Sequence, residues 1–142
     1  QRAERMGHVE SRFQLPIGSA LETDVLTVPP DATAAEFVYV HVLGRRERTV
    51  TVVDNGQYVG MCDLDHLKEI PRDQWEEVTV GEIMATDLPT GRASWTFRDG
   101  VVAMEAADID VLPITDADGG FIGVVRADDI LKLGEILDET GN

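Results

Sequence analysis

The segment that follows Gly123 carries the side chains best suited to chemistry. It reads Gly-Val-Val-Arg-Ala-Asp-Asp over residues 123–129, so an arginine and a carboxylate stand three residues apart. The carboxylate of Asp129 can accept hydrogen bonds from two hydroxyl groups at once, as the 2′,3′-diol of a ribose would offer. The guanidinium of Arg126 suits a phosphate group. An acid at the positive end of a helix would also explain Asp129, and that explanation needs no ligand.

These side chains are predicted to stand at a corner where a strand turns into a helix. Val124 and Val125 finish the strand, and Gly123 lets another backbone segment approach closely. The strand before it opens with Val-Leu-Pro at residues 111–113. Because Pro113 has no N–H, we expect this rim to have partly unpaired backbone groups. Such a rim could contact the edge of a base, with apolar side chains covering its face.

An internal repeat indicates a second corner of the same kind. Gly18 and Gly81 are 63 residues apart, and so are Gly60 and Gly123. The segment Ile-Gly-Ser-Ala-Leu-Glu-Thr-Asp at residues 17–24 aligns in this register with Val-Gly-Glu-Ile-Met-Ala-Thr-Asp at residues 80–87. In the first copy, the positions of Arg126 and Asp129 are taken by Asp63 and His66.

Each copy predicts the same order of elements. A short strand (residues 25–28 and 88–90) leads to a helix, whose start is marked by a threonine three residues before an acid. A hairpin turning at Asp-Asn-Gly or Asp-Ala-Asp-Gly-Gly follows, and then a closing helix that starts near Asp63 or Arg126. One β-α-β-β-α unit is too small to bury its own sheet. We therefore expect an α/β fold of two such units, related by pseudo-twofold symmetry, with their sheets packed face to face.

The predicted domain boundaries follow from the repeat. We expect an N-terminal tether at 1–15, a first unit at 16–70, a linker at 71–79, a second unit at 80–138 and a tail at 139–142. Trp75 in the linker is expected to pack back on the domain. Because the chain begins at Gln1, we expect it to be part of a longer protein.

Composition excludes several classes of function. The 142-residue chain has a net charge of −15, which disfavours nucleic acid and anionic lipid as partners. It has no apolar run of about 18 residues that would span a membrane. The single cysteine, Cys62, suits a reducing compartment and is expected to be a buried, inert thiol. The three histidines are far apart in sequence, and no base accompanies a nucleophile, so we expect neither a metal site nor catalytic residues.

The quoted motifs resemble a known family. From about Pro16 to Leu137 the chain is similar to a tandem pair of cystathionine-β-synthase (CBS) domains, or Bateman module. The resemblance is carried by residues 80–87, by the hairpin and helix start at 109–131, and more weakly by residues 49–67. It implies a regulatory module that is not an enzyme, with two clefts between the sheets. Such modules often bind AMP, ADP, ATP or S-adenosylmethionine, and two modules often form a homodimer.

The resemblance also implies which residues contact a ligand. The family motif Gly-h-h-Thr/Ser-x-x-Asp keeps its ribose-binding acid at Asp129, while Arg126 replaces the hydroxyl residue. The residues implied for this cleft are Asp129, Arg126, Thr23, Asp24, Val25, Thr49 and Val50. The second cleft departs further from the motif, because His66 replaces the acid and the negative Asp63 disfavours phosphate. Its residues are Thr86, Asp87, Leu88, Val111, Leu112, Pro113, Asp63 and His66.

The resemblance leaves two functions open. One is a nucleotide-binding regulator of an attached membrane transporter or channel. The other is a ligand-free dimerisation or gating module. The segments at 1–17 and 66–84 look like the cytosolic tail of a bacterial chloride channel family protein, and the latter is also similar to site-2-type zinc proteases. Both imply a cytoplasmic module fused to a membrane-embedded domain.

Overall fold

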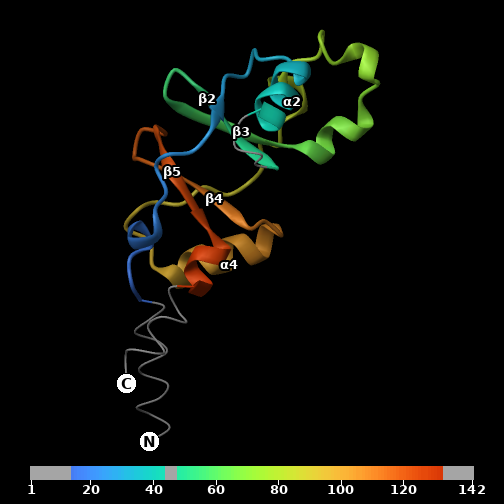
Figure 1. The fold of residues 1–142 in the computed structure, drawn as a ribbon. Coiled ribbons are helices and arrows are strands. Elements are labelled where there is room, and N and C mark those ends of the chain that lie inside the picture. The colour runs from blue at the N-terminus through green and yellow to red at the C-terminus, as the bar shows by residue number, and fades with distance from the viewer. Residues whose placement is uncertain (1–13, 44–47, 133–142) are drawn as a thin grey trace, which may run out of the picture. The chain divides into compact units, whose positions relative to one another are not determined.

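The computed structural model describes residues 14–43 and 48–132, which form two compact units (Figure 1). The Asp129 unit contains residues 14–24, 89–118 and 122–132. The Asp63 unit contains residues 25–43, 48–88 and 119–121. Both combine helices with strands, which confirms the predicted α/β class. Within the described ranges, no helix is both long and apolar enough to cross a membrane.

The Asp63 unit is built on a three-stranded sheet. Its order is β1 (Thr27–Val28), β2 (Thr49–Asp54) and β3 (Gln57–Asp63). β1 runs parallel to β2, and β2 pairs antiparallel with β3. Asn55 and Gly56 form the two-residue turn between β2 and β3 with φ of 51° and 82°. Asn and Gly tolerate positive φ better than other residues, so this turn confirms the predicted hairpin.

Helical segments cover this sheet. They are α2 (Ala34–Leu43), α3 (Val80–Ile83) and the 3-10 helices η2 (Leu64–Glu69) and η3 (Arg72–Gln74). The N–H of Glu36 donates to Thr33 Oγ1 at 3.1 Å, and the N–H of Thr33 donates to Glu36 Oε2 at 3.3 Å, as expected for the start of α2. The core includes Phe37, Val50, Val52, Cys62 and Val80. Trp75 packs against this core, which confirms its expected position.

The Asp129 unit has a two-stranded sheet of β4 (Val111–Thr115) and β5 (Phe121–Arg126). Its helical segments are η1 (Ile17–Ala20), α4 (Phe97–Ala107) and residues 127–132. Thr96 and Asp99 form the capping box predicted for α4. The strand expected at residues 88–90 is reduced to a single parallel bridge between Gly91 and Ile114. The core comprises Ile17, Phe97, Met104, Leu112, Ile114, Val125 and Ile130.

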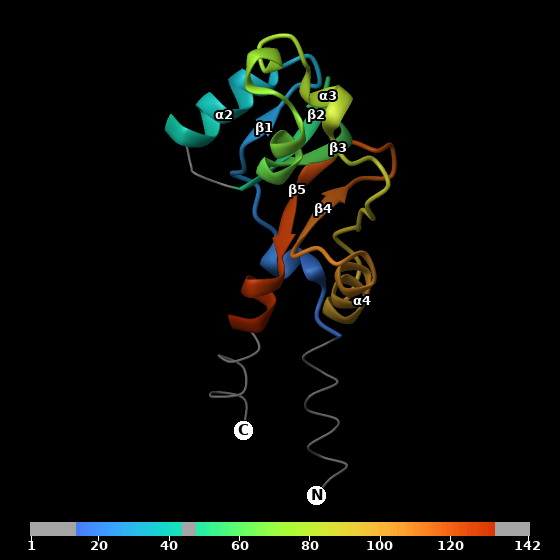
Figure 2. The ribbon, with the colours of Figure 1, turned by 90° about the vertical axis from the view of Figure 1, so that its right-hand side faces the viewer.

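The segment that leads into each sequence copy pairs with a strand of the other copy. Glu22, from the first copy, forms an antiparallel bridge with Val124 on β5, and Ala85, from the second copy, forms one with Met61 on β3. Figure 2 shows the first of these segments, in blue, beside β5. The compact units therefore divide the chain differently from the sequence repeat at 16–70 and 80–138.

Glycine at positions 60 and 123 allows the backbone segments of both bridges to approach closely. A Cβ on Gly123 would lie 2.3 Å from the carbonyl oxygen of Glu22, and a Cβ on Gly60 would lie 2.7 Å from that of Ala85. Both distances are below any tolerated contact with backbone. The close approach expected at Gly123 is thus made by the chain itself.

Candidate ligand-binding site

An open hollow of about 690 Å³ lies at the corner after Gly123, within the Asp129 unit. Arg126 and Asp129, the two residues first singled out from the sequence, both line it. We call it the Asp129 hollow, and its full lining is Ser19, Ala20, Leu21, Glu22, Arg126, Asp129 and Lys132. Arg126 is the last residue of β5, and Asp129 and Lys132 lie on the helical segment 127–132. The other lining residues lie on η1 or directly after it.

Glu22 pairs with Arg126 in this hollow. Arg126 Nε donates to Glu22 Oε2 at 2.7 Å, and the two side chains are 30% and 35% exposed. The backbone holds Glu22 in place, because its N–H donates to Val124 O at 2.8 Å and its carbonyl accepts from Val124 N at 2.9 Å. Long side chains at diagonal positions of an antiparallel pair reach each other, which explains the contact.

The charges that line the Asp129 hollow balance locally. Arg126 and Lys132 contribute two cations, and Glu22 and Asp129 contribute two carboxylates. The chain as a whole carries −15, so the hollow is a local exception to an acidic molecule. Asp129 is half-buried, whereas the neighbouring Asp128 is exposed. A ligand that offers hydroxyl groups to Asp129 and a negative group to the cations would match these side chains.

The sequence did not indicate that Glu22 and Lys132 line this hollow. Glu22 lies 104 residues from Arg126, and the sequence-based set named its neighbours Thr23 and Asp24 instead. A signal was present in the repeat register, in which Glu22 is aligned with Ala85 and Arg126 with Asp63. The equivalent corner, where Ala85 and Asp63 take these positions, thus lacks both members of the pair.

The remaining residues implied for this cleft are divided between the units. Thr23 and Asp24 belong to the Asp129 unit and are exposed. Val25, Thr49 and Val50 belong to the Asp63 unit, and the Val50 side chain is only 1% exposed within the core of that unit. Any ligand contact made by Val50 would therefore use its backbone. Grouping these three residues with Asp129 stays a prediction.

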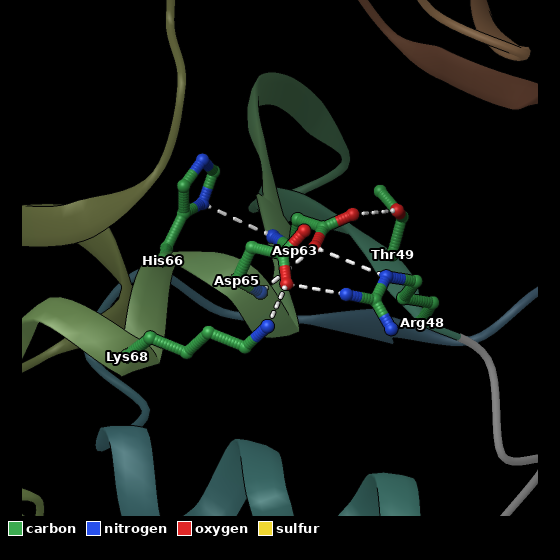
Figure 3. Close-up of polar contacts among 6 residues, drawn as sticks. All are labelled: Arg48, Thr49, Asp63, Asp65, His66 and Lys68. Atoms are coloured by element: carbon green, nitrogen blue, oxygen red, sulfur yellow. Dashed lines mark hydrogen bonds and ion pairs between the residues drawn. The ribbon is translucent and has the colours of Figure 1, made fainter.

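The equivalent corner of the Asp63 unit is occupied by its own hydrogen bonds (Figure 3). Asp63 caps η2: its carboxylate accepts from the N–H of Asp65 at 2.8 Å and from Thr49 Oγ1 at 2.7 Å. The N–H of Asp63 donates to His66 Nδ1 at 3.1 Å. The two residues that take the positions of Arg126 and Asp129 are thus engaged in capping.

Two cations surround this cap (Figure 3). Arg48 pairs with Asp65 and lies 3.6 Å from Asp63, measured from Nε to Oδ1, and Lys68 Nζ lies 3.0 Å from Asp65 Oδ1. The hydrogen bond from Lys68, together with the charges of Lys68 and Arg48, holds the pKa of Asp65 below its usual value. Much of the positive charge at this corner is therefore already paired with carboxylates.

The other residues implied for the second cleft are also divided. Thr86 and Asp87 are exposed and Leu88 is half-buried, all in the Asp63 unit. Val111, Leu112 and Pro113 lie on β4 of the Asp129 unit, and the last two are fully buried. The carbonyl of Pro113 accepts from Gly91 N at 2.9 Å, so this backbone group of the rim is paired.

The structure offers no cluster of metal ligands within residues 14–43 and 48–132. No three side chains of the His, Cys, Asp or Glu type come together there in a metal-binding arrangement. His8 lies outside the described residues, as does the side chain of His41.

Comparison with protein families finds a match in the second half of the chain. Residues 80–135, which include the Asp129 corner, match the family model described as CBS domain. A comparison with curated proteins gives no match to the sequence.

Solved structures share the fold of nearly the whole chain. The CBS domain of a CBS domain containing membrane protein from Sphaerobacter thermophilus is 22% identical, with a TM-score of 0.75 over 93% of this chain and 95% of that one. The CBS domain of a bacterial CNNM/CorC family Mg2+ transporter in complex with ATP is 14% identical, with a TM-score of 0.79 over 93% and 95%. The cytosolic domain of the Mg2+ channel MgtE in complex with ATP is 21% identical, with a TM-score of 0.72. That match covers 89% of this chain but only 52% of the MgtE chain.

Proposed function

Because residues 80–135 match the CBS domain family model and the chain shares the fold of CBS-domain structures, we propose that it is a regulatory module for adenosine nucleotides. In this proposal the module binds a ligand of the AMP, ADP or ATP class at the Asp129 hollow. It thereby controls a membrane transporter or channel to which it is fused, from the cytoplasmic side. A homodimer of modules is the assembly that we propose.

One observation carries the proposal. Asp129, Arg126 and Lys132 converge on one hollow within a single compact unit. Asp129 supplies acceptors for ribose hydroxyls, and the two cations supply donors for phosphate. The CNNM/CorC and MgtE structures were both solved in complex with ATP, which supports the choice of ligand class. Their membrane transporters likewise support the type of attached protein.

Calorimetry tests this proposal directly. AMP, ADP, ATP and S-adenosylmethionine are titrated into the wild-type chain, Asp129→Ala and Asp128→Ala, at protein concentrations that detect a Kd of about 0.1 mM. We expect at least one adenosine compound to bind the wild type and Asp128→Ala, and its affinity to fall about tenfold or more in Asp129→Ala. No heat with any of the four compounds would reject nucleotide binding.

A second function is favoured by the Asp63 corner. Its acid and its histidine cap η2 rather than face a ligand, and Glu22 adds a negative charge beside the arginine of the other corner. A module that couples or gates an attached membrane protein, such as a chloride channel or a site-2-type protease, would need no ligand. Absence of nucleotide binding combined with dimerisation in light scattering would favour this second function.

A further inference from the structure

We propose that Glu22 sets the ligand class of the Asp129 hollow, because its carboxylate competes with phosphate groups for Arg126. Under this proposal the hollow favours adenosine ligands with few phosphates over those with many. The inference rests on the proposed function, since it concerns how the same hollow discriminates among its ligands.

The first support is the way in which Glu22 is held. Both backbone hydrogen bonds of its bridge with Val124 are made, at 2.8 and 2.9 Å. The Glu22 carbonyl oxygen also lies so close to Gly123 that a Cβ there would be only 2.3 Å away. The main chain therefore fixes where the side chain starts. Only side-chain rotation can move the carboxylate away from Arg126 Nε, which it contacts at 2.7 Å.

The repeat provides an internal comparison. At the equivalent corner, Ala85 bridges Met61 just as Glu22 bridges Val124, and Asp63 occupies the position of Arg126. The alanine offers no carboxylate where the arginine is absent. Glu22 therefore occurs together with Arg126, at the corner that carries Asp129. This is expected if Glu22 acts on Arg126.

The electrostatic consequence depends on the number of ligand phosphates. A phosphate that approaches Arg126 must share it with Glu22 or displace the carboxylate, and each further negative charge adds repulsion from Glu22. A ribose that binds Asp129 meets no such competition. Since the paired side chains are 30% and 35% exposed, water screens part of the effect. We expect a change in affinity of about three- to tenfold.

The experiment compares adenosine, AMP and ATP on three versions of the chain: wild type, Glu22→Gln and Asp128→Asn. Glutamine keeps the size of glutamate and an oxygen that can accept from Arg126 Nε, but it removes the charge. Asp128→Asn is the matched control, because it removes one negative charge from an exposed position outside the lining of the hollow. Thermal unfolding of each variant checks that it is folded.

The ratio of affinities distinguishes the outcomes. The proposal predicts that Glu22→Gln strengthens ATP binding by about three- to tenfold, AMP binding by less, and adenosine binding by less than twofold, with no such change of ratio in Asp128→Asn. Equal ratios in wild type and Glu22→Gln would overturn the inference and leave nucleotide binding intact. If no version binds any of the three compounds, the proposed function fails as well.

A spectroscopic readout follows the contact itself. In the wild type, the ¹H–¹⁵N signal of Arg126 Nε should keep its hydrogen-bonded position when adenosine binds and should move when ATP binds. An Nε signal that stays unchanged in a chain saturated with ATP would overturn the inference, because the phosphates would then bind without disturbing the pair.

Discussion

The Asp65 carboxylate lies within reach of Lys68 and Arg48, and this setting gives a prediction at the scale of one residue. The hydrogen bond from Lys68 and the two positive charges lower its pKa from 3.8. A carboxyl with a lower pKa in the folded chain stabilises the fold above its ordinary pKa, and this contribution is lost as pH falls through the folded value. We therefore expect Asp65 to support folding at neutral pH and to stop doing so only below pH 3.8.

Carboxyl ¹³C titration measures this pKa. In the wild type the Asp65 midpoint should lie below 3.8, and Lys68→Met should move it upward toward that value. Arg72→Gln serves as the control, because the cations that lower the pKa of Asp65 are Lys68 and Arg48, not Arg72. A midpoint that is the same in wild type and Lys68→Met would contradict the assigned cause.

Cys62 gives a second prediction at this scale. Its side chain is fully buried in β3, and burial together with the charge of Asp63 raises the pKa of the thiol to about 12. Thiolate is the reactive form, so the native chain should react very slowly with an aromatic disulfide reagent at pH 8. Reaction should become fast and stoichiometric in denaturant. Rapid labelling of the native chain would contradict this account.

The sequence placed two residues together where they are close along the chain. Asp129 and Arg126 are three positions apart, and both line one hollow. Glu22 was missed because the backbone bridge that joins it to β5 spans distant parts of the chain. A sequence motif records neighbours along the chain, but an ion pair depends on which segments the fold brings together.

At the scale of elements, the bridge between Glu22 and Val124 depends on Gly123. A Cβ at this position would meet the Glu22 carbonyl at 2.3 Å, and backbone cannot rotate away as a side chain can. We expect Gly123→Ala to lower the free energy of unfolding by about 1–3 kcal/mol, measured by denaturant titration.

Gly18→Ala is the matched control for this prediction. Its added Cβ would lie 3.3 Å from the Ala93 carbonyl oxygen and 3.6 Å from Ala93 Cβ, so a small adjustment accommodates it. The control should be clearly less destabilised than Gly123→Ala. Equal stability losses in the two variants would argue that the close approach at Gly123 does not matter.

Local signals predicted most elements but not all. The threonine–acid spacing marked the starts of α2 and α4, because a capping box is satisfied within four residues. The strand expected at residues 88–90 forms only a single bridge at Gly91, and the proline at position 89 has no N–H to contribute to a ladder. Strand formation depends on a partner elsewhere in the chain, which short-range patterns do not specify.

At the scale of the whole molecule, the repeat aligns equivalent positions of the two copies but does not indicate how the chain divides into its two compact units. The segments 17–24 and 80–87 match in sequence, yet each packs with the strands of the other copy. A repeat in the sequence aligns equivalent positions, but it does not indicate that a segment of one copy pairs with a strand of the other.

The net charge of −15 gives a prediction about ligand binding. The charges that line the Asp129 hollow cancel, so the long-range field on an approaching anion comes from the rest of the acidic chain. Salt screens that field, and the screening length falls from about 30 Å at 0.01 M to about 8 Å at 0.15 M. ATP affinity should therefore rise over this range while adenosine affinity stays constant. Calorimetry at both salt concentrations checks this, and a fall in ATP affinity would contradict it.

The central claim is that nucleotide binds at the Asp129 hollow, and mapping of backbone amide shifts during an ATP titration tests it most directly. We predict the largest shifts at residues 19–22 and 123–132, with smaller ones at the Asp63 corner, and their loss in Asp129→Ala. Shifts centred on residues 63–66, or no shifts at millimolar ATP, would contradict the account.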